Sequence, residues 1–176
     1  MAVTFLRTLL ALCRVSALPT VWSNCLAGWW LGGGGNVESL PLLFGGATLI
    51  YLGGAFLNDA FDANYDRDHR RARPVPSGAV SLKTVWRWGL GFVAAGGLLL
   101  IWAGRTPGGL GLGLIFLILL YDAFHRLVTF SPVVLGLCRF FLYLVGASIA
   151  QDGVSGWSIW CGLALGAYVS GHGGLA

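Results

Sequence analysis

Four polar side chains with closely spaced positions stand out in a chain that is otherwise apolar. Asn58, Asp62 and Asp66 lie four residues apart, so on a helix they share one face, and Asp59 adjoins the first of them. Like charges at this spacing repel by about 0.2–0.5 kcal/mol per pair in water, and by more where the dielectric constant is lower. A divalent cation would relieve that repulsion. The segment is therefore interpreted as a candidate metal site.

Arginines follow the acidic segment directly, at positions 67, 70, 71 and 73. Mg²⁺ is usually held by one or two carboxylates together with phosphate oxygens. The planar guanidinium group offers two parallel donors to the same phosphates. Acids, Mg²⁺ and a basic loop together predict a diphosphate site at the edge of a membrane.

Parts of the sequence also resemble two other phosphate- or cation-binding motifs, and neither fits. An EF-hand loop fails because Arg67 occupies the glycine position and Arg73 the twelfth position. A phosphate-binding P-loop fails because Asn36 follows the glycines at 32–35. A solvated loop, in which acids and arginines simply neutralise one another, stays open as the structural alternative.

The composition indicates the environment of these charges. The chain has 176 residues, of which 56% are hydrophobic and 10% charged, and its mean hydropathy is +0.76. Soluble domains carry about 25% charged residues, so we expect an integral membrane protein in a lipid bilayer. Continuous apolar runs argue against a β-barrel. The net charge of +4 is clustered, which favours an anion site and membrane orientation over binding to nucleic acid.

Six hydrophobic segments predict an all-α polytopic bundle that forms a single domain over residues 1–176. The first and fourth are shorter than the roughly 20 residues that cross a bilayer core. An interfacial helix is expected at Val3 to Leu12. The six segments are Leu18 to Leu31, Leu40 to Leu57, Thr84 to Ala103, Gly108 to Tyr121, Pro132 to Ala150 and Trp157 to Leu175. The expected breaks are at 32–36, 105–107 and 151–153.

Basic residues predict the orientation, because cytoplasmic loops are enriched in Lys and Arg. With the N-terminus inside, nine basic residues fall on the cytoplasmic side and only Arg105 outside, while Arg139 lies within the fifth segment. The acidic motif is then expected at the cytoplasmic face of the cytoplasmic membrane.

The motif Asn58-Asp59-x-x-Asp62-x-x-x-Asp66, followed by Arg73-Pro74-x-x-x-Gly78, resembles the first aspartate-rich motif of the UbiA superfamily of intramembrane prenyltransferases. The stretch at 14–24 resembles that family's first helix, and the stretch at 121–126 the end of its fourth. Together with 25–35, the first of these is most similar to the EboC branch. The resemblance implies nine transmembrane helices around a cavity, Mg²⁺ as cofactor, and transfer of a prenyl group from a prenyl diphosphate to an aromatic or other lipophilic acceptor.

The resemblance also implies roles for individual residues. Asn58, Asp62 and Asp66 would bind metal and diphosphate, with Asp59 supporting them. Asn24 would face the cavity or form a hydrogen bond between helices, and Tyr121 would border the substrate. The remaining candidates for substrate contacts are Arg14, Arg73, His125 and Arg126.

Two departures from the family pattern shape the functional hypotheses. His125 stands where the family usually has a lysine, and capping of a helix end is its alternative role. A second aspartate motif is expected after the sixth segment but is absent there, and Asp122 and Asp152 are not expected to replace it. We therefore expect about six of nine helices, in a chain that is incomplete at its C-terminus or has a degenerate second motif. A prenyltransferase and a non-catalytic protein that binds or transports an isoprenoid or pigment precursor both remain open, whereas an unrelated permease leaves the motif spacing unexplained.

Overall fold

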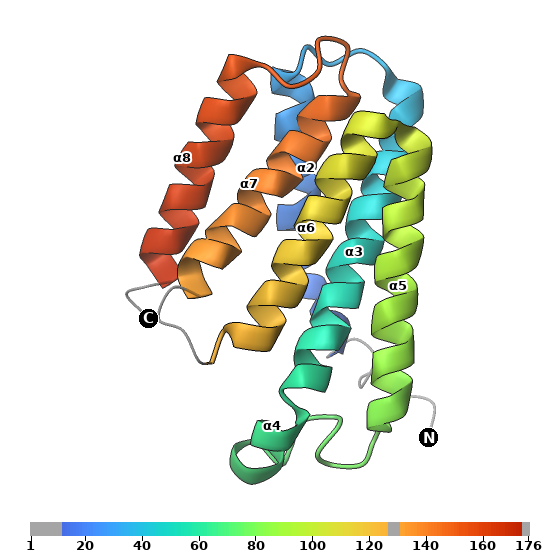
Figure 1. The fold of residues 1–176 in the computed structure, drawn as a ribbon, viewed down its shortest axis with the longest axis vertical. Coiled ribbons are helices and arrows are strands. Elements are labelled where there is room, and N and C mark those ends of the chain that lie inside the picture. Colours follow the sequence, from blue (N-terminus) through green and yellow to red (C-terminus); the bar gives the residue numbers. More distant parts are fainter. Residues whose placement is uncertain (1–11, 127–130, 174–176) are drawn as a thin grey trace.

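The computed structural model describes residues 12–126 and 131–173, and within these ranges its regular structure is entirely helical, which confirms the predicted all-α class (Figure 1). Of the expected interfacial helix at Val3 to Leu12, all but Leu12 lies outside the described residues. The elements are η1 (Val15–Ala17), α2 (Leu18–Leu31), η2 (Val37–Ser39), α3 (Leu40–Phe61), α4 (Ala63–His69), α5 (Leu82–Ala103), α6 (Arg105–Phe124), α7 (Ser131–Ile149) and α8 (Gly156–Gly173).

Four helical stretches in the described ranges are long and apolar enough to cross a membrane. They are Val37–Phe61, which joins η2 to α3, and the helices α5, α6 and α7. Each of the six predicted segments coincides with a helix, and α2 is short, as expected, with 14 residues. The structure thus supports an integral membrane protein.

The predicted break at 105–107 is wrong. Helix α6 begins at Arg105 and has 20 residues, so the fourth segment is not short. Pro107 lies in the first turn, where a backbone N–H has no helical partner and the missing donor therefore costs little. The chain turns instead at Gly104, whose φ of 152° favours glycine.

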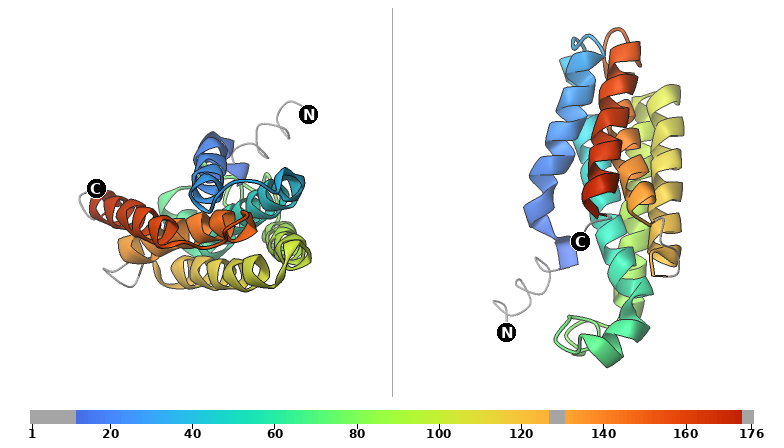
Figure 2. Two further views of the ribbon diagram at one scale, coloured as in Figure 1. Left: turned by 90° about the horizontal axis from the view of Figure 1, so that it is seen from above. Right: turned by 90° about the vertical axis from the view of Figure 1, so that its left-hand side faces the viewer.

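The helices pack side by side in one bundle, which Figure 2 shows from above. Helix α3 packs along α5, which contacts α6, while α2, α6 and α8 all pack against α7. Glycines allow α2 and α7 to approach closely: a Cβ atom on Gly28 would clash with the carbonyl oxygen of Tyr143, and one on Gly146 with that of Cys25. Small residues at such contacts are typical of helices packed within a membrane.

The two ends of the bundle differ in character. The predicted turns at 32–36 and 151–153 lie at one end, with positive φ at Gly33 (94°) and Gly153 (71°). Helix α4 and the loop at 70–81 lie at the other, which we call the α4 end (Figure 1). Helix α3 continues past the predicted Leu57 to Phe61, so Asn58 and Asp59 belong to its last turn.

Candidate functional site

The junction of α3 and α4 holds the acidic motif. The backbone N–H of Asp62 donates to the carbonyl of Asn58 at 3.0 Å, and that of Asp66 to Asp62 at 2.9 Å. Helical hydrogen bonding therefore continues across the junction and keeps these three residues on one face, as predicted. All three, and Asp59, are buried, with exposed fractions of 8% or less. The alternative of a solvated loop is wrong because the acids are buried. Its other part, pairing of the acids with arginines, does occur.

Arg14 reaches this junction from the turn before α2. Its Nη2 donates to Oδ1 of Asp59 at 2.9 Å and also to Oδ1 of Asn58. The Arg14 backbone has a φ of 44°, a left-handed conformation that costs a non-glycine residue about 1–2 kcal/mol. The Tyr51 hydroxyl of α3 donates to the Arg14 carbonyl at 2.8 Å, which helps to hold this conformation.

Arg73 returns to the acids from the loop at 70–81. Its Nη1 donates to Oδ2 of Asp66 at 2.9 Å and to Oδ1 of Asp59 at 3.3 Å, and lies 3.9 Å from Oδ2 of Asp62. The loop is fixed because its two valines, at 75 and 80, pack against the hydrophobic cluster around Phe56. Gly78 has a φ of 76°, a left-handed conformation that glycine adopts without strain.

Arg126 lies just beyond α6 and contacts the same carboxylates from the opposite side. Its Nε donates to Oδ1 of Asp62 at 2.7 Å, and its guanidinium lies 3.6 Å above the centre of the Tyr65 ring. Partial burial acts to lower the pKa of Arg126, but the hydrogen bond to Asp62 and the charges of Asp62 and Asp66 outweigh it and raise the pKa. The group therefore stays cationic.

His125 contacts both the end of α6 and the acidic cluster. Its Nδ1 lies 3.1 Å from the carbonyl oxygen of Tyr121, as expected for a residue that caps the helix end. Its Nε2 lies 3.3 Å from Oδ1 of Asp62. Because both ring nitrogens face oxygen acceptors, both contacts are hydrogen bonds only when the ring carries two protons.

Asp122, which was not expected to replace the second aspartate motif, lies beside the first one. It lies within α6, is buried, and its Oδ1 accepts a hydrogen bond from Nδ2 of Asn58 at 3.1 Å. Within the described residues, its Oδ2 has no hydrogen-bond partner. A signal was present: Asp122 precedes Arg126 by four residues, a spacing that puts both on one side of a helix end.

A cavity of about 170 Å³ extends from this polar group into the bundle. Asn58, Asp122 and Arg14 line the cavity next to the acidic cluster, Arg139 of α7 adds a second arginine, and most other lining side chains of α3, α6 and α7 are apolar. Tyr121 borders the cavity, as predicted; Asn24 is buried in α2 but is not among the lining residues. A cavity of about 150 Å³ holds a benzene molecule, so there is room here for one ring or one short branched segment.

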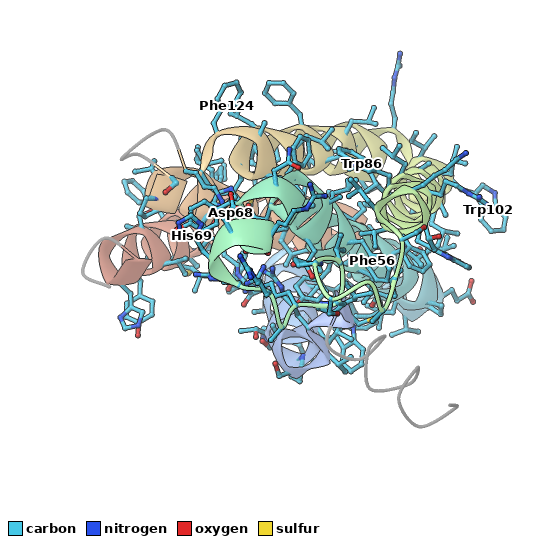
Figure 3. All side chains as sticks on the ribbon, turned by 90° about the horizontal axis from the view of Figure 1, so that it is seen from below. Phe56, Asp68, His69, Trp86, Trp102 and Phe124 are labelled. Atoms are coloured by element: carbon cyan, nitrogen blue, oxygen red, sulfur yellow. The ribbon has the colours of Figure 1, made fainter. Side chains whose placement is uncertain are left out.

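No group of three or more His, Cys, Asp or Glu side chains converges as for a metal ion in residues 12–126 and 131–173. The guanidinium groups hold the carboxylates instead. The donor chemistry nevertheless suits a hard cation: the acids are oxygen ligands, and Oδ1 of Asp66 is buried without a hydrogen-bond partner in the described part of the chain. Figure 3 views this α4 end from below, with Asp68 and His69 on α4 and Phe124 at the end of α6.

Fold and site together define an integral membrane helical bundle with a charged cluster at the mouth of an apolar cavity. The chain belongs to the UbiA prenyltransferase family, whose sequence model matches residues 16–174. This confirms the resemblance of the acidic motif.

The chain is similar to two archaeal proteins named digeranylgeranylglyceryl phosphate synthase. It is 35% identical to the one from Sulfolobus acidocaldarius over 83 residues and 36% identical to the one from Methanopyrus kandleri over 84 residues. These alignments cover 47% and 48% of this chain and 29% of each relative. A solved structure described as that synthase in membranes matches with a TM-score of 0.79 at 19% identity. The match covers 95% of this chain and 59% of the solved one, and it shows a shared fold.

Proposed function

We propose that the protein transfers a prenyl group from a prenyl diphosphate to a lipophilic acceptor within the membrane. The observation that carries this proposal is the position of Asp62 and Asp66: two buried carboxylates, contacted by arginines from separate segments, at the mouth of an apolar cavity. Membership of the prenyltransferase family and the names of the relatives support it.

The chain's own residues would bind and orient the diphosphate. Arg14, Arg73 and Arg126 place three guanidinium groups around one acidic cluster, each partly exposed and able to donate to phosphate oxygens. Asn58, Asp62 and Asp66 would hold Mg²⁺, with Asp59 keeping Arg14 and Arg73 in place. When bound, Mg²⁺ supplies positive charge that neutralises the departing diphosphate.

In this mechanism the bond between the prenyl carbon and the diphosphate oxygen breaks, and the electron pair leaves with the diphosphate. The arginines stabilise that developing charge because they are already oriented towards it. The allylic cation would lie in the cavity, where the apolar walls of α3, α6 and α7 exclude water that would otherwise capture it. Tyr121 and His125 would border the substrate at the cavity mouth.

We further propose that the α4 end faces the cytoplasm. In the described part of the chain, Lys and Arg lie mainly at this end, in α4, in the loop at 70–81 and at the start of α5, whereas Arg105 begins α6 at the opposite end. The enrichment of basic residues on the cytoplasmic side of membrane proteins supports this orientation. Labelling of single cysteines placed at positions 78 and 104 in intact cells tests it.

The activity is tested with purified protein in nanodiscs, Mg²⁺ and a series of prenyl diphosphates, with released diphosphate as the measured product. We expect release by the wild type and a loss of at least about 100-fold in Asp62→Ala, the size expected when a group that stabilises developing charge is removed. Asp68→Ala is the matched control, because Asp68 is exposed on α4 outside the cluster. Equal rates for wild type and Asp62→Ala would refute the assignment.

A non-catalytic binding protein is the second candidate function. It is favoured by the pairing of Asp59, Asp62 and Asp66 with arginines, which leaves these acids neutralised without a metal. This candidate predicts tight Mg²⁺-dependent binding of a prenyl diphosphate and no release of diphosphate in the same nanodisc assay.

A further inference from the structure

A single arginine lies inside one of the membrane-spanning helices. Arg139 is in α7, eight residues after Ser131, or about 12 Å along the helix axis at 1.5 Å per residue. It lines the cavity together with Leu135, Cys138 and Leu142 of the same helix. Its depth separates it from Arg126, which lies at the α4 end beyond α6.

Arg139 has no acidic side chain as a partner in residues 12–126 and 131–173. All seven acidic residues of the sequence lie within the described ranges. Within residues 12–126 and 131–173, no ion pair and no side-chain hydrogen bond involves Arg139. The ion pairs there belong to Arg14, Arg73, His125 and Arg126.

An unpaired guanidinium at the centre of a membrane helix costs about 2.5–3.5 kcal/mol on insertion scales, and such residues generally face a cavity and have a function. Arg139 faces the cavity, as this rule requires. A guanidinium offers two parallel N–H donors to a carboxylate or a phosphate. The cavity therefore presents apolar walls with a cation set into one of them, a combination that fits an amphiphile carrying an oxyanion.

We propose that Arg139 binds an oxyanion, a carboxylate or a phosphate, carried by the lipophilic acceptor. This inference rests on the proposed prenyl transfer and adds to it the chemical class of the acceptor. The diphosphate of the donor already has three arginines at the mouth of the cavity, at the α4 end. Arg139 contacts none of the acids that those arginines hold, so its anion is a separate group.

The cavity also sets the arrangement of such an acceptor. Asn58 and Asp122 line its polar part beside the proposed donor site, while Tyr51 and Leu142 line the part towards the membrane interior. If the oxyanion of the acceptor binds Arg139, the neighbouring atoms of the acceptor lie between Arg139 and the proposed donor site. Arg139 is thus a positioning residue that selects anionic acceptors over neutral ones.

The test is binding of three 14-carbon probes that differ only in the head group: tetradecyl phosphate, tetradecanoate and tetradecanol. Binding is measured by titration calorimetry on the purified protein in a neutral detergent, without a prenyl diphosphate. We expect the wild type to prefer at least one anionic probe over the alcohol by about tenfold or more, the scale of one charge-assisted hydrogen bond. The stronger of the two anionic probes identifies phosphate or carboxylate as the group selected.

Two substitutions make the result specific. Arg139→Gln removes the cation and is expected to abolish the preference for the anion, whereas Arg139→Lys keeps the charge and retains part of it. Arg105→Gln is the matched control, because Arg105 is exposed at the opposite end of the bundle, and it should bind as the wild type does.

The proposal is overturned if Arg139→Gln keeps the preference, or if it weakens all three probes equally, which would mark a purely structural role. Wild-type release of diphosphate is measured alongside. Absence of that release refutes the proposed prenyl transfer itself, whereas normal release with no anion preference refutes only the assignment of Arg139.

Discussion

The hydrogen bond between Asn58 and Asp122 makes a sharp prediction about how the site is positioned. Both side chains are buried, and Nδ2 of Asn58 donates to Oδ1 of Asp122 at 3.1 Å. Asp122→Ala leaves that amide N–H without a partner and opens a small space beside it. An unsatisfied buried group costs about 1–3 kcal/mol, so we expect thermal unfolding about 2–12 °C lower, at roughly 2–4 °C per kcal/mol for a chain of this size.

Asp122→Asn separates geometry from charge. Its side-chain oxygen can still accept from Asn58, and the substitution removes a buried carboxyl group whose Oδ2 has no partner in the described part of the chain. We therefore expect a melting temperature equal to that of the wild type or higher. If Asn58 acts as a ligand, Asp122→Ala should also reduce diphosphate release by up to about 100-fold, because a displacement of about 1 Å at a reactive centre has that effect.

The assays are thermal unfolding followed by tryptophan fluorescence in detergent, and diphosphate release at saturating Mg²⁺. The reasoning is refuted if Asp122→Ala melts and reacts as the wild type does, since the hydrogen bond would then position nothing. It is also refuted if Asp122→Asn is the less stable of the two variants.

Three further predictions concern the anion site, the packing and the metal. His125→Lys should lower the KM for a prenyl diphosphate about three- to tenfold, because an ammonium group adds a positive charge at this contact; a higher KM would contradict the assigned role. Gly28→Ala should destabilise the protein by about 1–3 kcal/mol through its clash with the Tyr143 carbonyl. Gly91→Ala, which meets no atom within 4 Å, is its control, and equal melting temperatures would refute the packing argument. EDTA should stop diphosphate release and Mg²⁺ restore it, while undiminished release in EDTA would exclude the metal.

The helical fold and the shared face of the acids could be predicted because both depend on local spacing. Apolar runs near 20 residues indicate spanning helices, and the repeat of four from Asn58 to Asp66 survives the α3–α4 junction because helical hydrogen bonds cross it. The helix bounds were less predictable. Pro107 looked like a break but fits into the first turn of α6.

The other half of the cluster depends on tertiary packing. That the Asp122 side chain would meet Asn58, 64 residues earlier, follows from the contact between α3 and α6, which no local pattern encodes. The family resemblance indicates Arg14 and Arg73, but their shared partner, Asp59, cannot be deduced from spacing. The sequence shows Arg139 as a charge in an apolar segment. Only the structure shows that Arg139 lines the cavity.

The ion pairs at the α4 end impose an order on the making of this protein. Asp62 and Arg126 are 64 residues apart in the chain, and at about 5–20 residues per second the ribosome needs roughly 3–13 s to add them. During that interval the acids of α3 and α4 exist with Arg14 and Arg73 but without Arg126. The cluster reaches its full complement of partners only after α6 has been synthesised and has docked, so its completion marks a correctly assembled bundle. A nascent chain that halts before α6 carries, at the α4 end, an Asp62 side chain that lacks its Arg126 partner.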